Sequence, residues 1–246
     1  MPDQFSRTEL LFGQEAMQKL AAARVAVFGV GGVGGYAVEA LARSGVGALD
    51  LIDSDTISLT NINRQLLATH DSIGKSKVEV AKQRILSINP ACTVTTHQVF
   101  YLPETEAQFD FTQYDYIIDA IDTVSGKLAL IVNAQKAGTP IICSMGAGNK
   151  LDPTAFRVAD IYETSADALA RVIRKECRKR GIAHLKVVYS QEEARRPLTE
   201  AQAPLCTPGA GRKDIPGSTA FVPSVAGLIL AGEVIKDIAG INKRIG

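Results

Sequence analysis

The feature that most constrains this chain of 246 residues is a glycine-rich turn between a strand-like and a helix-like segment. Residues 24–28 form a Val-rich apolar run typical of a buried parallel strand. Residues 36–44 carry Ala and Leu at helical spacing. The intervening GVGGVGG segment (29–35) fits the fingerprint that places a phosphate at a helix N-terminus. We expect a nucleotide here; a turn of packing glycines without a ligand is the alternative. The glycines expected at the ligand are Gly29, Gly31, Gly32 and Gly34.

Strand-like and helix-like segments alternate from residue 24 to residue 146. Strands are predicted at 48–52, 92–96, 114–120 and 141–145, and helices at 75–88 and 127–137. This alternation predicts an α/β, Rossmann-like, doubly wound and mostly parallel sheet with helices on both faces. Residues 156–161 and 186–189 are expected to extend the sheet as antiparallel strands, and residues 224–238 to form the last helix.

We interpret residues 1–246 as one domain with three parts. Residues 1–23 are an N-terminal helical arm, 24–146 the Rossmann-like nucleotide-binding part, and 147–246 a substrate-binding and dimerisation part. Within the third part, residues 191–218 contain four Pro and three Gly, which predicts a long flexible loop.

Composition excludes several classes of protein. The net charge of +1 argues against a globally basic surface. The four cysteines form no CxxC pair, so we expect neither structural zinc nor a disulfide framework. No apolar segment resembles a signal peptide or reaches the roughly 20 residues of a membrane span. A cytoplasmic protein is expected.

Charged and polar residues beyond the turn favour ATP over NAD. Asp53 ends the second strand, where an acid usually binds a ribose hydroxyl, but both nucleotides carry that ribose. Arg64 and Lys77 supply positive charge, and Asp122 follows a strand and could hold Mg²⁺. With Asn61 they would gather at the carboxyl edge of the sheet. In adenylation, negative charge builds on the α-phosphorus of ATP and on the departing pyrophosphate, and cations stabilise that charge. The cations at this edge therefore indicate adenylation.

A second charged pattern lies in the distal part of the chain. Residues 164–167 resemble a capping box that opens a helix. Leu169, Val172, Ile173 and Cys177 are expected to face the core, and Glu176 is the one acid in the helix. The basic residues recur on the opposite side and are Arg171, Arg174, Lys175, Arg178 and Lys179. Such a face either binds nucleic-acid phosphates or is merely solvated.

The motifs at 29–65, 74–90 and 119–123 resemble those of the ThiF/MoeB/HesA adenylating superfamily, which is related to ubiquitin-activating enzymes. The resemblance implies that Asp53 binds the ribose and Asp122 binds Mg²⁺. It implies that the triphosphate is bound by Asn61, Arg64, Gln65 and Lys77. It also implies a homodimer in which Arg7 reaches the partner's ATP.

Residues 144–190 and 216–238 resemble the tRNA threonylcarbamoyladenosine dehydratases. The resemblance implies an ATP-dependent, ligase-type cyclising dehydratase that adenylates the carboxylate of threonylcarbamoyladenosine in tRNA. Arg64, Lys77 and Asp122 would be catalytic, and the basic helix would bind tRNA. No enzyme nucleophile is required, because the attacking atom belongs to the substrate.

Two other functions remain open. The first is an activator of a ubiquitin-like or sulfur-carrier protein, for which Cys206 would be a reactive thiol and a sulfur-relay protein a partner. Without that function we expect Cys206 to be an ordinary cytosolic thiol. The second is a nucleotide-binding oxidoreductase or a non-catalytic dimeric scaffold.

Overall fold

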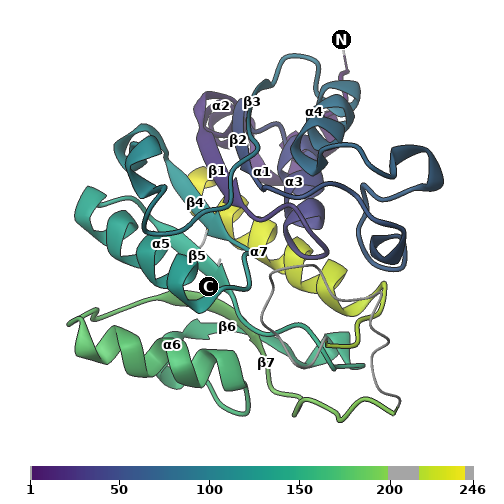
Figure 1. Ribbon diagram of the computed structural model, residues 1–246. Coiled ribbons are helices and arrows are strands. Elements are labelled where there is room, and N and C mark those ends of the chain that lie inside the picture. Colours follow the sequence, from purple (N-terminus) through teal and green to yellow (C-terminus); the bar gives the residue numbers. More distant parts are fainter. Residues whose placement is uncertain (1, 199–215, 242–246) are drawn as a thin grey trace.

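The computed structural model describes residues 2–198 and 216–241. In these ranges the chain forms one seven-stranded sheet in the order β3-β2-β1-β4-β5-β7-β6, with helices on both faces (Figure 1). The Rossmann-like α/β fold predicted from the sequence is confirmed. The strands are β1 Arg24–Phe28, β2 Ala48–Ile52, β3 Thr93–His97, β4 Tyr116–Asp119, β5 Ile141–Ser144, β6 Phe156–Asp160 and β7 Lys186–Ser190.

The prediction of two antiparallel strands is wrong for one of them. β7 pairs with β5 in parallel, and only the edge strand β6 runs antiparallel to its neighbour. The reason lies in the connection. The segment after β6 returns to the carboxyl edge of the sheet, where Asp167 bonds to Gly146, and a helix then crosses back to the start of β7. β7 therefore starts at the amino edge of the sheet, as β5 does, and the two strands run parallel.

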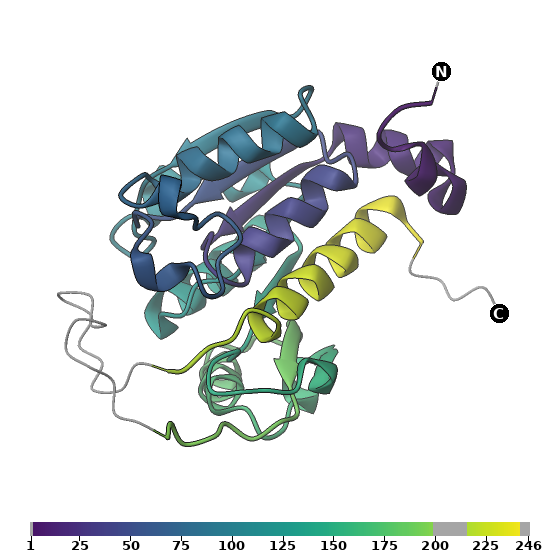
Figure 2. The same ribbon diagram turned by 90° about the vertical axis from the view of Figure 1, so that its right-hand side faces the viewer.

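The helices are α1 Ser6–Phe12, α2 Gln14–Ala22, α3 Gly34–Arg43, α4 Lys77–Ile88, α5 Val124–Ala137, α6 Ala168–Lys179 and α7 Val222–Ala239. Buried side chains of α3, α4 and α7 share a core with one face of the sheet. Those of α5 and α6 pack on the other face, together with the connection 98–114 (Figures 1 and 2). Short 3₁₀ helices lie at Leu59–Asn61, His70–Ser72, Glu106–Gln108, Phe111–Gln113, Pro153–Ala155 and Ile161–Glu163.

Helix α7 brings the C-terminal part of the chain against the glycine-rich turn. It packs along α3, as Figure 2 shows. The two helices approach so closely that a Cβ on Gly227 would lie 2.1 Å from the Val33 carbonyl oxygen. Near the start of α7, Pro223 lies 3.5 Å from the position of a Cβ on Gly32. Residues far apart in sequence therefore border the same turn.

Helix α6 begins later than the sequence pattern suggested. Its N-cap is Asp167, which accepts a hydrogen bond from the Ala170 N–H, and not Thr164. Ala166 has a left-handed φ of 55°, which ends any helix that would begin at Thr164. The expected core face is also wrong at Val172, which is 42% exposed, whereas Ile173 and Cys177 are buried as expected.

The N-terminal arm is helical and lies at the periphery of the molecule (Figure 2). Helix α1 has no buried residue, and Leu10 and Leu11 are 86% and 84% exposed. Among the residues described here, no helix has the length and apolar character needed to cross a membrane.

Candidate active site

The glycines of the turn are of two kinds: at some positions the fold leaves no room for a side chain, and at another it does. Gly29 has φ +88°, and a Cβ there would lie 2.8 Å from the Ala120 backbone. A Cβ on Gly34 would lie 1.8 Å from the Gly29 oxygen. On Gly31 the nearest atom to a Cβ would be Gln65 Nε2, at 3.7 Å, which is an ordinary van der Waals distance. Packing therefore explains Gly29 and Gly34, whereas Gly31 leaves backbone open to a ligand.

Asp53 is held rigidly at the end of β2, beside this turn. One carboxylate oxygen accepts a 2.8 Å hydrogen bond from the Val30 N–H, and the other accepts a 2.9 Å bond from the Asp55 N–H. Burial raises the pKa of Asp53 above its ordinary value. An acceptor fixed in this way, just beyond the glycines, has the position from which ribose hydroxyls are bound.

Lys77, the first residue of α4, lies between two acids at the same edge of the sheet. Its Nζ is 2.7 Å from Asp55 Oδ2 and 4.0 Å from Asp53 Oδ1, and its side chain is only 6% exposed. Sequence reasoning missed Asp55. Its signal was the alternation Asp53-Ser54-Asp55 after a buried strand, which places two acids on one side of the chain.

The loop between β2 and α4 places Arg64 and Gln65 against the turn. The Asn61 carbonyl accepts bonds from the Arg64 and Gln65 N–H groups at 3.1 and 2.8 Å. Its side-chain oxygen accepts the Ser58 N–H at 3.1 Å. Asn61 therefore shapes the loop. Arg64 donates to two neutral oxygens, Thr60 O at 3.0 Å and Asn63 Oδ1 at 2.9 Å, and burial lowers its pKa.

Buried polar atoms without a protein partner gather around this edge. Among the described residues they are Gln65 Oε1, Ser76 Oγ and Thr219 Oγ1. Gln65 faces Gly31, Ser76 precedes Lys77, and Thr219 precedes α7. Leaving such an atom unsatisfied costs about 1–3 kcal/mol. Their concentration at one place is typical of a site that a polar ligand completes.

An acidic side chain for which the sequence predicts a role in Mg²⁺ binding lies just beyond β4. Asp122 is exposed and lies two residues beyond Ala120, which contacts Gly29. No group of three or more His, Cys, Asp or Glu side chains that could hold a metal occurs in the described part of the chain. Mg²⁺ usually takes one or two carboxylates together with substrate phosphates, so a single Asp is compatible with Mg²⁺ bound to ATP.

A buried ion pair that sequence reasoning missed lies below the turn that carries Asp122. Lys127 Nζ and Asp119 Oδ2 are 2.9 Å apart, and both side chains are completely buried. Asp119 also accepts the Ile121 N–H at 3.3 Å, and burial raises its pKa. Strand and helix patterns alone give no signal for such a pair, because both residues lie within otherwise apolar segments.

Other residues singled out in the sequence lie elsewhere. Phe5 contacts Gly45, between α3 and β2, so Arg7 lies at the amino edge of the sheet, away from this chain's own glycine turn. Cys206 is outside the described residues. Cys92, Cys143 and Cys177 are buried free thiols. Burial raises the pKa values of Cys92 and Cys177 to about 11, which makes both poor nucleophiles at neutral pH.

The basic residues of α6 are partly engaged within the protein. Arg174 donates to Thr164 O and Oγ1 at 2.8 and 2.6 Å, and the Arg178 guanidinium lies 5.4 Å from the centre of the Tyr162 ring. Lys179 pairs with Glu176 at 2.7 Å. Arg171 and Lys175 are exposed.

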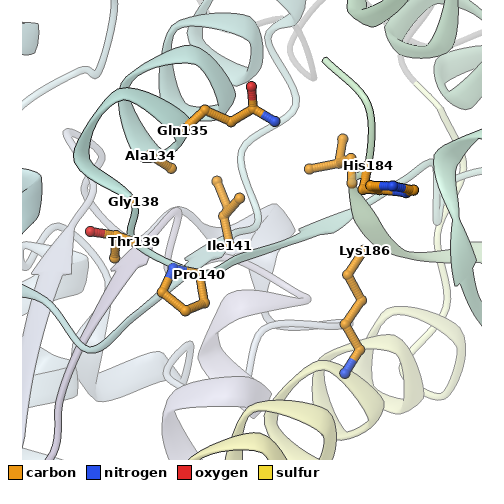
Figure 3. A pocket seen from close by; sticks show the side chains of 9 residues that line it. Ala134, Gln135, Gly138, Thr139, Pro140, Ile141, His184 and Lys186 are labelled. Carbon is orange, nitrogen blue, oxygen red and sulfur yellow. The ribbon is translucent and has the colours of Figure 1, made fainter.

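A hollow on the opposite edge of the sheet is separate from this site. Figure 3 shows that it is lined by the end of α5, the start of β5 and residues near His184. The Lys186 side chain points away from the hollow towards α7, where its Nζ pairs with Glu233 at 2.7 Å and with Asp237 at 2.9 Å (Figure 3). Since strand carboxyl ends bind ligands in open α/β sheets, the glycine-turn edge is the candidate site.

Comparisons with known proteins agree with this geometry. The model of the ThiF family matches residues 5–245. The chain is 45% identical to the Bacillus subtilis tRNA threonylcarbamoyladenosine dehydratase over 97% of its length and 95% of that protein. The crystal structure of the Escherichia coli tRNA N6-threonylcarbamoyladenosine dehydratase TcdA in complex with ATP superposes with a TM-score of 0.84. That structure is 35% identical and aligns over 99% of this chain and 96% of its own.

A more distant relative shares only part of the chain. The adenylyltransferase and sulfurtransferase UBA4 of Vanderwaltozyma polyspora is 35% identical over 56% of this chain and 31% of that protein. With a family model that spans nearly all of its residues, and with the glycine turn, Arg64 and Lys77 at one edge of the sheet, the chain belongs to the ThiF family.

Proposed function

We propose that this protein is an ATP-dependent tRNA threonylcarbamoyladenosine dehydratase that works through an adenylated carboxylate. The observation that carries the proposal is Arg64, a partly buried cation beside Gly32 whose hydrogen bonds go to neutral oxygens. Hydride transfer does not require a cation at this position. Adenylation does, because negative charge develops on the phosphates beside it. Similarity to the Bacillus subtilis dehydratase over nearly the full length supports the substrate class.

The reaction balances with ATP as the only other reactant. A carboxylate oxygen of the threonyl group attacks the α-phosphorus of ATP, and pyrophosphate leaves. A nitrogen or oxygen of the substrate's own carbamoyl group then attacks the activated carbonyl carbon. The bond to AMP breaks, a proton is lost and a ring closes. AMP carries away the carboxylate oxygen, so the nucleoside loses the elements of water.

Different residues around the turn bind the phosphates, bind the ribose and stabilise the charge of the transition state. Backbone N–H groups at the start of α3, opened by Gly31 and Gly32, bind phosphate, and Asp53 binds the ribose. Arg64 and Lys77 stabilise the charge on the α-phosphorus and on pyrophosphate. Gln65 offers a buried side chain with an unsatisfied oxygen beside Gly31, and Asn61 holds the loop that carries Arg64 and Gln65.

Mg²⁺ bound with ATP would neutralise charge on the phosphates. Asp122 is the residue that would hold it, because its carboxylate lies on the same edge as the glycine turn and a single protein carboxylate suffices for Mg²⁺ on a nucleotide.

The surface of α6 is the proposed contact for the tRNA backbone. Its N-terminus lies near Gly146 at the carboxyl edge, so the helix leads away from the active site along one side of the protein. Arg171 and Lys175 are the exposed cations best placed to bind phosphates, with Arg178 and Lys179 continuing the row and Arg174 fixing the preceding segment.

A homodimer is proposed from the N-terminal arm. Helix α1 buries none of its residues and exposes Leu10 and Leu11 almost fully, which is typical of a surface that another chain covers. Arg7 on this helix lies at the amino edge of the sheet, whereas the glycine turn of the same chain lies at the carboxyl edge, and so its proposed role is at the partner's ATP.

The proposal is tested by pyrophosphate release from ATP with purified protein. tRNA that carries threonylcarbamoyladenosine is compared with the same tRNA without the modification. Release only with the modified tRNA supports the dehydratase. Release only with a carrier protein ending in Gly-Gly would instead assign the protein to sulfur-carrier activation, with a sulfur-relay partner.

A further inference from the structure

Asn63 connects two parts of the active-site edge that are distant in sequence. Its side-chain oxygen accepts a 2.9 Å hydrogen bond from Arg64 Nη1. Its side-chain nitrogen donates a 3.0 Å hydrogen bond to the carbonyl of Ser218, which lies 155 residues further along the chain. One exposed amide therefore contacts both the cation at the glycine turn and the segment that leads into α7.

A second asparagine holds this segment from the other side. Asn149 accepts the Gly217 N–H at 2.6 Å through its side chain, and its own N–H donates to the Gly217 carbonyl at 2.8 Å. Asn149 adopts a left-handed φ of 58°, a conformation that asparagine tolerates better than most residues. The backbone at 217–218 is thus fixed between the loop after β5 and the loop that carries Arg64.

The fixed segment borders the glycine turn. Thr219, the next residue, has a buried hydroxyl without a protein partner, and Pro223 lies 3.5 Å from the position of a Cβ on Gly32. Arg64 Cγ lies 3.4 Å from that same position. The Arg64 side chain and the entry to α7 therefore meet at one glycine, where the phosphates are expected.

We propose that Asn63 is a positioning residue that sets the Arg64 guanidinium and the α7 entry segment as one unit. It acts through Arg64 and does not itself contact the reacting atoms. The inference rests on the proposed adenylation of a substrate carboxylate. A long Arg side chain loses rotational freedom when it is held, and a cation held in advance stabilises a transition state without reorganisation. The exposure of Asn63 argues against a main role in stability.

A double-mutant cycle tests the proposal. Asn63→Ala is expected to lower kcat for pyrophosphate release about 10–100-fold and to raise the KM for ATP much less, because an interaction that grows in the transition state is removed. In an Arg64→Ala background, Asn63→Ala should change kcat less than about twofold, since the residue through which it acts is gone.

Asn133→Ala is the matched control. This side chain also makes two hydrogen bonds through one amide, to Tyr101 and Glu106, but it lies on α5, away from Arg64. It should retain wild-type kcat, and melting temperatures of all variants should show folded protein. Wild-type kcat in Asn63→Ala, or additive losses in the double variant, would overturn the proposal.

The same cycle is measured on ATP affinity without any tRNA. The loss of affinity expected for Asn63→Ala is smaller than the loss in kcat, because most of the effect arises in the transition state. Disappearance of that loss in the Arg64→Ala background supports the coupling, and a loss of the same size in both backgrounds refutes it. This affinity measurement tests the coupling of Asn63 to Arg64 even when the wild-type protein releases no pyrophosphate with modified tRNA. Failure of the proposed function would then be visible in the wild type alone, and failure of the Asn63 proposal in the cycle.

Discussion

Lys77 Nζ lies 2.7 Å from Asp55 Oδ2, and this ion pair places a nearly buried cation at the carboxyl edge of the sheet. Asp53 is the second acid within reach, at 4.0 Å. Under the proposed function, a lysine held between carboxylates beside the glycine turn is positioned before the nucleotide binds. We expect the cation to exchange part of its carboxylate pairing for phosphate when ATP binds.

Loss of Lys77 is expected to slow the chemical step. Lys77→Ala should lower kcat for pyrophosphate release about 10²–10³-fold, because charge on the departing pyrophosphate loses its partner. Asp55→Asn is the paired variant: it removes the acid but leaves the amine, so its effect on kcat should be much smaller. Steady-state kinetics with modified tRNA provide the measurement. Equal reductions of kcat in the two variants would show that the ion pair is required and the lysine charge by itself is not.

Arg64 should not be replaceable by lysine. Both hydrogen bonds of its guanidinium, to Thr60 O and Asn63 Oδ1, use the single nitrogen Nη1. The planar guanidinium carries further N–H donors that can bind a phosphate in a fixed fork, which an ammonium group held by the same two oxygens cannot offer. We expect Arg64→Lys to keep the melting temperature and to lower kcat about tenfold or more, with Arg64→Ala lower still. Full activity of Arg64→Lys would reduce the role of Arg64 to net charge.

Substitution of two glycines of the turn should have different effects, one on ATP affinity and the other on the stability of the fold. Gly31→Ala places a methyl group 3.7 Å from Gln65 Nε2, so the fold should hold, while ATP affinity falls by about tenfold because backbone and phosphate are kept apart. Gly34→Ala places its methyl group 1.8 Å from a carbonyl oxygen and should cost about 3 kcal/mol of stability. Thermal unfolding and ATP titration distinguish them. Wild-type ATP affinity in Gly31→Ala would contradict phosphate binding at this turn.

The α6 surface gives a prediction about salt. Arg171→Glu together with Lys175→Glu should weaken tRNA binding and reduce the slope of log affinity against log salt by about one for each phosphate that is no longer neutralised. Both residues are exposed, so folding should be unaffected. Lys19→Glu with Arg43→Glu, exposed on α2 and α3, changes the net charge by the same amount and is the control for net charge. An unchanged slope would remove α6 from the tRNA interface.

Glu176 should titrate at an unusually low pH. Hydrogen bonds from Lys179 and Arg180 lower its pKa from the ordinary value of 4.5 to about 2. Because the folded-state pKa is depressed, any stabilisation by these pairs is present above pH ~4.5 and disappears as the pH falls towards ~2. NMR titration of the carboxyl carbon gives the value directly. A pKa at the ordinary value would mean that Lys179 and Arg180 are not engaged and are available to phosphates.

The parts of the fold governed by short-range pattern could be predicted from sequence. The strand at 24–28 and the glycine turn follow from apolar runs and backbone requirements that act within a few residues. The direction of β7 could not, because it depends on where residues 161–167 turn back, and Asp167 settles this through a bond to Gly146. The start of α6 was misplaced for the same reason.

In the candidate site, too, residues within local motifs could be predicted and residues whose role depends on distant partners could not. Arg64, Lys77 and Asp53 were predicted from their motifs, and the sheet brings them to one edge. Asn63 was missed because its partner Ser218 is 155 residues away, a pairing that exists only once α7 packs on α3. Asp55 was missed although it alternates with Asp53, because its pairing with Lys77 depends on where α4 begins in space.

The most direct test of an adenylated carboxylate follows one oxygen atom. tRNA whose threonylcarbamoyladenosine carries ¹⁸O in the threonyl carboxylate is incubated with ATP and the protein, and AMP is analysed by mass spectrometry. If the carboxylate attacks the α-phosphorus and AMP later leaves with that oxygen, each AMP formed should contain one ¹⁸O from a fully labelled carboxylate. AMP without the label, formed together with the cyclised nucleoside, would contradict adenylation of the carboxylate.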